Sequence, residues 1–210
     1  MTGSLVFESA DDRADAGAFL ARVVRLDPAA LVRLRRAGRS VELWSWLPLD
    51  VLVTRRVAGR LDPADQSVVA ADLLARLDDD PVAVTLPDSR DAQWRGALPA
   101  SGGWQRLEAV PSADLLVLVR AGTDAFRAAA VSADPGRVGE ALLDHESLTV
   151  SDDGTTVAVP LRVLQALARM GFLRSDGEVV VAASPAWLRC DAAYGSAYRR
   201  RGGGLSLFPA

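Results

Sequence analysis

The most apolar stretch of the chain spans residues 41–57, and its alternation predicts two strands joined by a turn at Pro48 and Asp50. Large apolar side chains fall on both faces of each strand, and Trp44 and Trp46, two of the five tryptophans, lie in the first. A hairpin at the edge of a sheet usually presents one polar face. We therefore predict a central hairpin that is covered on both sides.

Apolar positions at helical spacing predict helices around this hairpin. One stripe predicts a helix from Asp11 or Asp12 to about Val24. The tripeptide Leu-Asp-Pro then occurs twice, ending at Pro28 and Pro63. Aspartate as N-cap followed by proline at the first helical position is a helix start signal. We therefore predict one helix from Pro28 to Gly38 and another from Pro63 to about Leu77.

The second half of the chain mixes helical stripes with hairpin signals. Residues 82–86 predict a strand, and residues 87–103, rich in Pro, Gly, Ser and Asp, predict a domain boundary or a long connection. Beyond this segment, helical spacing predicts four helices, over 112–122, 123–131, 134–143 and 160–170. Asp-Gly pairs predict two hairpins, one with its turn at Asp153-Gly154 and one at Asp176-Gly177 that joins 172–173 to 178–183. A further strand is predicted over 187–192.

The order of these elements predicts an α+β fold with two closely packed parts, each with a small antiparallel sheet. The first part, residues 1–100, centres on the tryptophan-rich hairpin. The second, residues 101–210, combines helices with a small antiparallel sheet.

Composition narrows the classes of function. The 210 residues carry a net charge of −3, which argues against nucleic acid as a partner. All 24 basic residues are Arg, which indicates codon bias from a GC-rich genome, so no single Arg can be taken as selected for binding an anion. The single cysteine, Cys190, forms no intrachain disulfide, and no apolar run reaches the length of a signal or membrane span. We predict a cytoplasmic protein with no membrane contact.

Several segments resemble one known group of proteins. The chain resembles a family of uncharacterised bacterial proteins from GC-rich genomes in three regions. These are WLPLDVLVTR at 46–55, the motifs LP, GWQR and VP between 98 and 111, and LARMGFL at 167–173 followed by WLR and YGS. The resemblance covers most of the chain and agrees with two parts. It implies no activity, cofactor or partner.

Candidate catalytic groups are few. His145, the only histidine, lies between Asp144 and Glu146, but three consecutive residues on regular structure cannot all face one ion. Cys190 lies in a predicted strand, where a buried packing role is favoured over a dyad with His145. No phosphate-binding loop, nucleophile elbow or paired-cysteine motif occurs. We predict no metal and no cofactor, and we favour a non-catalytic protein.

Two tryptophan–arginine pairs flank the irregular segment. Trp94 with Arg95, and Trp104 with Arg106, could form a pocket for an anionic or aromatic small molecule. The alternative is that both tryptophans anchor the segment to the core, which is the commoner use of aromatic side chains.

The helix predicted over 160–170, followed by a hairpin, is similar to half of a winged helix. Its periodicity places Arg162, Gln165 and Arg169 on an outer face that could meet a major groove, with residues 199–201 as a flexible basic arm. Two charges on a helix face give little affinity for phosphates, so a solvated face is favoured.

The lack of catalytic residue types and the apolar excess together favour a protein that acts through association, as a homodimer or with another protein partner. One alternative is a small-molecule binding protein or enzyme with a site near Trp94 and Trp104, and another is a weak winged-helix-like nucleic-acid binder. We also expect the apolar residues Leu205, Leu207 and Phe208 to dock on a surface.

Overall fold

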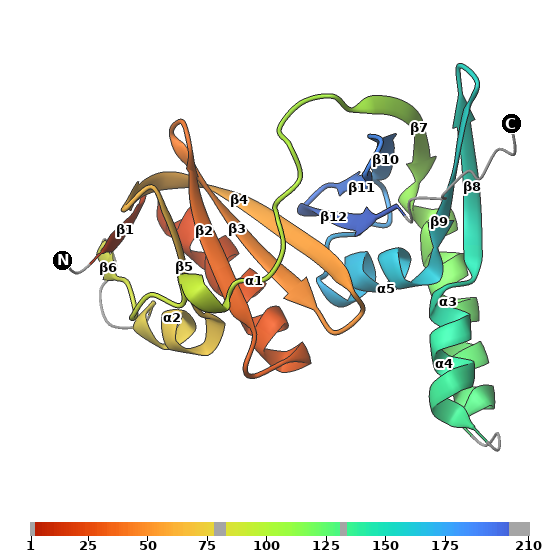
Figure 1. Cartoon of the computed structure of the whole chain (residues 1–210), viewed down its shortest axis with the longest axis horizontal. Helices are drawn as coiled ribbons and strands as arrows, with labels where there is room; N and C mark the ends of the chain where they lie inside the picture. The colour runs from red at the N-terminus through yellow and green to blue at the C-terminus, as the bar shows by residue number, and fades with distance from the viewer. Residues whose placement is uncertain (1–2, 78–82, 131–133, 202–210) are drawn as a thin grey trace, which may run out of the picture.

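The structure is a computed structural model that describes residues 3–77, 83–130 and 134–201 (Figure 1). The N-terminal half contains β1 (Ser4–Phe7), α1 (Ala10–Leu26), β2 (Leu31–Ala37), β3 (Ser40–Leu47), β4 (Val51–Asp62), β5 (Asp65–Val69), α2 (Ala70–Arg76), β6 (Ala83–Thr85) and the short 3-10 helix η1 (Asp91–Gln93). The C-terminal half contains β7 (Gln105–Pro111), α3 (Ser112–Ala129), α4 (Pro135–Leu143), β8 (Glu146–Asp152), β9 (Thr155–Pro160), α5 (Leu161–Arg169), β10 (Glu178–Ala183), β11 (Trp187–Ala192) and β12 (Gly195–Arg200). The predicted α+β class is confirmed.

Ten of the strands form one antiparallel sheet that runs through both halves. Its main order is β5-β2-β3-β4-β12-β11-β10-β7, with β1 paired to the far end of β4 and β6 paired to β1. Strands β8 and β9 form a separate hairpin. The halves meet where β4 pairs with β12, with Thr54 opposite Ser196 and Leu52 opposite Tyr198.

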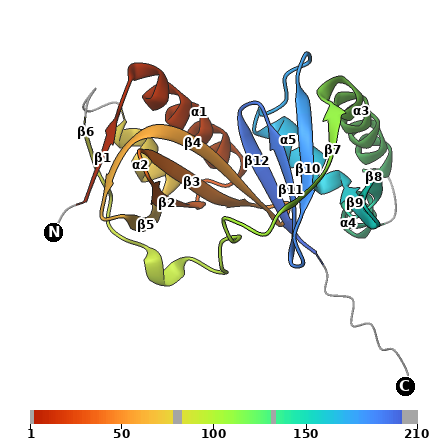
Figure 2. The same cartoon turned by 90° about the horizontal axis from the view of Figure 1, so that it is seen from above.

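One hydrophobic core lies between the helices and one face of this sheet. It includes Phe19 of α1, Leu164 of α5 and Val53 of β4, so the two halves share the core. Phe19 also stacks on Phe172, which follows α5, with ring centroids 6.4 Å apart. Figure 2 shows α1 and the segment that connects the halves on opposite sides of the N-terminal strands.

The predicted central hairpin is confirmed as β3 and β4. Val41 and Leu43 are fully buried on the face toward α1, and Trp44 is buried on the opposite face. Strand β3 lies between β2 and β4, so it has no free edge. Both faces are apolar because both are covered.

The helix predicted over 28–38 is wrong, because residues 31–37 form β2. Val32 and Leu34 are fully buried while Arg33 and Arg35 are partly exposed, which is the alternation of a strand. Asp27 is not the N-cap of a second helix but the C-cap of α1, where its N–H donates to the Val23 carbonyl. Its carboxylate accepts a hydrogen bond from Ala29 N at 2.9 Å and so stabilises the turn between α1 and β2.

Other predicted boundaries moved for related reasons. In the second Leu-Asp-Pro, Leu61 and Asp62 end β4 and Pro63 lies in the turn to β5, so the helix there begins only at Ala70. No new helix starts at Thr123, because α3 continues through it. Gly122 does not end the helix; an added Cβ would lie 2.6 Å from Leu161, so glycine allows close packing of α3 on α5.

The prediction for the C-terminal elements is confirmed except for the strand at 172–173 and the missing strand β12. The hairpin at Asp153-Gly154, the helix at 160–170 and the strands over 178–183 and 187–192 are confirmed. No strand forms at 172–173. Residues 195–200 form β12, so the predicted flexible arm at 199–201 is wrong for Arg199 and Arg200. Val82, Leu205, Leu207 and Phe208 lie outside the described residues.

Within the part of the chain that the structure describes, no helix combines the length and apolarity needed to cross a membrane.

The junction of β1 and β4 leaves no room for a side chain at Gly59. A Cβ there would lie 2.5 Å from the carbonyl oxygen of Val6 in the paired strand. We expect Gly59→Ala to lower the free energy of unfolding by about 1–3 kcal/mol, measured by urea denaturation. Gly102→Ala is the control: nothing lies within 4 Å of its Cβ, and we expect a change within about 0.5 kcal/mol. Equal stability of the two variants would contradict this packing.

Candidate functional site

The segment that connects the two halves crosses the outer face of the sheet, opposite the helices. That face carries a second apolar cluster, formed by Trp44, Leu52, Trp187 and Tyr198. The connecting segment covers this cluster with its partly buried side chains, which are Trp94, Leu98 and Trp104. Both tryptophans of the connecting segment therefore pack on the sheet.

Polar contacts hold the first part of this segment to β5 and β2. The Asp91 carboxylate accepts the backbone N–H of Ser67 in β5, and the Arg90 N–H donates to the Ser67 carbonyl at 2.7 Å. Within the sheet, Arg33 of β2 donates two hydrogen bonds to Asp65 of β5 at 2.7 and 2.8 Å. Burial alone would raise the pKa of Asp91, but hydrogen bonds from Ser89 and Ser67 and the charge of Arg33 lower it. The Arg33 guanidinium also lies 5.8 Å from the Trp94 ring, and this contact helps to orient that ring.

The second part of the segment is anchored by Trp104. Its ring contacts Tyr198 edge to face at 5.8 Å, and the Arg189 guanidinium lies 4.5 Å above it. Burial raises the pKa of Tyr198 to about 12, so its hydroxyl stays protonated at neutral pH.

The four residues predicted to bind a small molecule do not line one pocket. Trp94 and Arg95 line a groove beside Trp46, whereas Trp104 lies against a different depression with Arg189. Arg106 is exposed on β7. The small-molecule site at these four residues stays a prediction.

The groove beside Trp46 is a large concave surface at the end of the sheet junction. Its volume is about 690 Å³, within the range of roughly 300–1,000 Å³ that ligand sites occupy. The apolar lining residues come from the α1–β2 turn, the β3–β4 hairpin and the connecting segment: Ala30, Leu31, Trp46, Leu47, Pro48 and Trp94. We call this surface the Trp46 groove.

Charged side chains stand at the rim of the Trp46 groove. Asp27 and Asp50 supply negative charge, and Arg95 and Arg200 supply positive charge. Among the described residues neither Arg95 nor Arg200 forms an ion pair, and the Arg200 guanidinium lies 5.2 Å from the Trp187 ring. An apolar floor with a polar rim of both signs is typical of protein interfaces.

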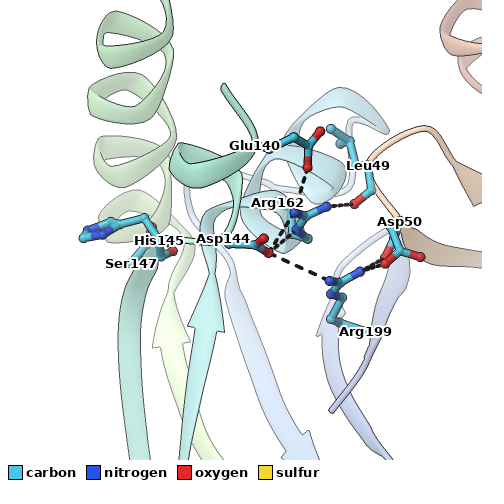
Figure 3. Close-up of polar contacts among 8 residues, drawn as sticks. All are labelled: Leu49, Asp50, Glu140, Asp144, His145, Ser147, Arg162 and Arg199. Carbon is cyan, nitrogen blue, oxygen red and sulfur yellow. Dashed lines mark hydrogen bonds and ion pairs between the residues drawn. The ribbon is translucent and has the colours of Figure 1, made fainter. Parts of the chain in front are cut away.

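Behind the groove, one buried arginine holds the β3–β4 turn against the C-terminal half (Figure 3). Arg162 of α5 is only 4% exposed. It donates to the Leu49 carbonyl at 2.8 Å, and it forms ion pairs with Asp144 at 2.7 Å and Glu140 at 3.2 Å. The predicted placement of Arg162 on an outer face is wrong, because these partners hold it inside.

Of the other two residues predicted to face nucleic acid, one is buried and one is exposed. Gln165 is also buried, and it donates a hydrogen bond to the Val119 carbonyl at 3.2 Å. Arg169 alone is exposed. The structure therefore does not bring the three together on one surface.

A second arginine extends the network to β12. Arg199 donates to the Asp50 carbonyl at 2.7 Å, pairs with the Asp50 carboxylate, and lies 3.8 Å from Asp144. Two guanidinium groups therefore fix the turn that forms one wall of the Trp46 groove. The carboxylates are largely exposed, whereas Arg162 is not.

His145 and Cys190 stand apart from this network. The side chain of His145 points away from Asp144 in Figure 3. Burial raises the pKa of Cys190 to about 12, so its thiol stays protonated at neutral pH. In residues 3–77, 83–130 and 134–201, no group of three or more His, Cys, Asp or Glu is arranged to hold a metal ion.

Sequence analysis missed most residues of the groove. Trp46 and Pro48 were assigned to the central hairpin, and Arg200 to a loose tail. Their neighbours in space, Ala30 and Trp94, are distant in sequence, and no local pattern links them. The one available signal was the second apolar face of β3, which requires a cover from elsewhere in the chain.

Comparisons with known families cover both halves. A family model described as "Domain of unknown function (DUF8185)" matches residues 99–204, and another described as "Domain of unknown function (DUF8010)" matches residues 1–96. A search of curated proteins found no match. These descriptions agree with the resemblance to uncharacterised proteins, and they do not test its motifs.

The fold is similar to that of solved bacterial sliding clamps. A DnaN sliding clamp (DNA polymerase III subunit beta) from Pseudomonas aeruginosa bound to griselimycin is 15% identical with a TM-score of 0.59, over 99% of this chain and 66% of that chain. A Caulobacter crescentus beta sliding clamp, described with PEG bound to a putative beta-motif tethering region, is 16% identical with a TM-score of 0.58, over 100% and 69%.

A putative DNA polymerase III beta subunit from Eubacterium rectale is 10% identical with a TM-score of 0.59, over 98% of this chain and 66% of that chain. The chain thus spans slightly less than two thirds of the Pseudomonas and Eubacterium proteins, at 66% of each, and 69% of the Caulobacter clamp. At these identities the likeness shows the fold alone.

The contacts of Arg162 make it a test of the network behind the groove. Arg162→Ala leaves the buried Leu49 carbonyl without its donor and two carboxylates without their partner. We expect a loss of about 2–4 kcal/mol in the free energy of unfolding, measured by urea denaturation. Arg127→Ala is the matched control, because Arg127 pairs with Asp124 in full exposure, and we expect a change within about 0.5 kcal/mol. A cost no larger than that of the control would contradict a structural role for Arg162.

Proposed function

The chain belongs, through residues 99–204, to the family described as Domain of unknown function (DUF8185), and we propose that it acts without catalysis by associating with other protein chains through the Trp46 groove. The single observation that carries this proposal is the groove itself. Its apolar floor is open to solvent and is rimmed by charges of both signs. An exposed apolar concavity of this kind favours a partner segment with apolar side chains and a polar backbone.

The position of the Trp46 groove supports a binding role. It lies where the β3–β4 turn, the connecting segment and the end of β12 converge. Arg162 and Arg199 hold the β3–β4 turn in place, so this wall of the groove is preorganised in the free protein. Preorganised walls reduce the entropy lost when a partner binds.

The similar solved structures support association in general terms. Those proteins are described as sliding clamps and as a subunit of DNA polymerase III, and one is described as bound to griselimycin. A protein described as a subunit works within an assembly. We extend only this mode of action, association, to the present chain.

Contact with DNA is not part of the proposal. The net charge of −3 opposes a general attraction to phosphates. Of the three residues predicted to form a nucleic-acid-binding face, Arg162 and Gln165 are buried. Salt-sensitive binding to DNA at low ionic strength would reopen this alternative.

A displayed library of random peptides tests the groove. Peptides are selected on the whole chain and on a chain that ends at Arg201, the last described residue. We expect both selections to enrich peptides with spaced apolar side chains. Ala29→Arg should weaken their binding at least tenfold, measured by fluorescence anisotropy, because Ala29 is exposed at the groove. Ala113→Arg, at an exposed position of α3, is the control. If no peptide distinguishes the two variants in either form of the chain, the proposal is overturned.

A homodimer is the second form of association that we propose. Val117 of α3 is 60% exposed, more than any other large apolar side chain among the described residues, and we take it as the centre of the dimer contact. We expect native mass spectrometry to give a species at twice the 22.2 kDa chain mass. A 22.2 kDa species at every concentration would contradict the dimer and leave a different protein as the partner.

A further inference from the structure

The outer face of the sheet carries a polar area beside the aromatic cluster. Two adjoining hollows lie on it, and both are separate from the Trp46 groove, since no described residue lines that groove and either hollow. The larger, about 370 Å³, is lined by Thr54 and Ser196 among others, and we call it the threonine hollow. The smaller, about 230 Å³, lies beside Trp104, and we call it the arginine hollow. Four residues line both hollows: Glu42, Arg56, Arg189 and Tyr198.

Strand pairing sets three charged side chains of the arginine hollow in one row. Arg35 of β2 is opposite Glu42 of β3, and Glu42 is opposite Arg56 of β4. Neighbouring strands lie about 4.8 Å apart, so the two arginines flank a single carboxylate. Glu42 forms an ion pair with Arg56 and also accepts the Trp44 indole N–H at 3.2 Å. The Arg35 guanidinium has no ion pair or hydrogen bond with any described residue.

Arg189 of β11 brings a further guanidinium to the arginine hollow. Its Nε lies 2.9 Å from the Asp191 carboxylate, and its guanidinium carbon lies 4.5 Å from the centre of the Trp104 ring. Its two terminal nitrogens form no hydrogen bond to a described residue. Four arginines line the arginine hollow, and among the described residues Glu42 is its only carboxylate. The hollow is therefore positively charged, and several of its N–H donors have no acceptor.

The threonine hollow contains a polar group without a partner. Thr54 is 9% exposed and lies between Trp44 of β3 and Ser196 of β12 in the sheet. Its hydroxyl is buried and forms no hydrogen bond to a described residue. Burial of an unpartnered hydroxyl costs free energy, and valine has nearly the same shape, so packing does not require this hydroxyl. It is available to a polar group of a ligand that enters the hollow.

From these contacts we propose that the outer face of the sheet binds a phosphate monoester of a small polar molecule. The phosphate lies in the arginine hollow, where Arg35, Arg56 and Arg189 donate hydrogen bonds to its oxygens. The polar body lies in the threonine hollow and forms a hydrogen bond with the Thr54 hydroxyl. A phosphate monoester is nearly doubly charged at neutral pH and has three acceptor oxygens, so it suits several guanidinium groups better than a singly charged carboxylate does. This site is independent of the Trp46 groove and of the partner proposed for it.

A titration of the whole chain with ribose 5-phosphate tests the site. We expect a dissociation constant of about 1 mM or less, read from the phosphorus NMR signal of the ligand at low salt. Arg35→Gln should weaken this binding at least fivefold, because it removes a guanidinium that donates to the phosphate. Arg120→Gln on α3 is the matched control: Arg120 is exposed, the change in net charge is the same, and we expect a change below twofold. Equal losses in the two variants, or no binding by the unaltered chain, would overturn the inference.

Two further probes test the hollows separately. Inorganic phosphate should bind at least threefold more weakly than ribose 5-phosphate, because it has no body to reach Thr54. Thr54→Val should remove this difference and leave the free energy of unfolding no lower, since the hydroxyl has no partner in the free protein. Equal affinity of the unaltered chain for the two probes, or a difference that persists in Thr54→Val, would overturn the placement of the polar body. Acetate that binds as tightly as inorganic phosphate would overturn phosphate as the recognised group.

Discussion

The pairing of β4 with β12 is the contact on which the rest of the structure depends. It joins the strands of the two halves into one sheet and sets which side chains lie on each face. Because side chains alternate along a strand, a slip of one residue would exchange the helix-covered core with the aromatic face. The Trp46 groove lies at the end of this junction, so the register that unites the halves also shapes the groove.

The aromatic face explains why the connecting segment takes its path. A sheet with Trp44, Leu52 and Tyr198 on its outer side needs a cover, and among the described residues no α-helix contributes a side chain to this cluster. The segment supplies Trp94 and Trp104 for this purpose and fixes its backbone through Asp91. The four residues of the cluster are buried, and the groove lies at its edge, where Trp46 and Trp94 line it.

Local patterns predicted the elements whose ends are marked by local chemistry. The central hairpin has a turn at Pro48, α4 has Asp134 as its N-cap, and α5 lies between Pro160 and Gly171. The same chemistry misled where a turn and a helix start share it. Asp27 before Pro28 reads as a cap, yet it stabilises a turn, and the alternation of Val32 and Leu34 was the better signal.

The site was less predictable, because its contacts join distant parts of the chain. Helical spacing placed Arg162 outside, but a buried carbonyl and two carboxylates compensate its charge inside. Arg199 and Arg200 resembled a loose basic arm, yet their partners, Asp50 and Trp187, make them part of a strand. Trp94 was selected for its neighbour Arg95, and its main neighbour in the groove, Trp46, is 48 positions earlier in the printed sequence.

The pairing of β4 with one of the last strands has a consequence for synthesis of the protein. The first half leaves the ribosome with one edge of β4 unpaired and its aromatic face uncovered. At typical translation rates of about 5–20 residues per second, β12 follows on the order of ten seconds later. An open edge beside tryptophans is prone to pair with other chains during that interval. The edge of β4 therefore stays open to such pairing until β12 has been made.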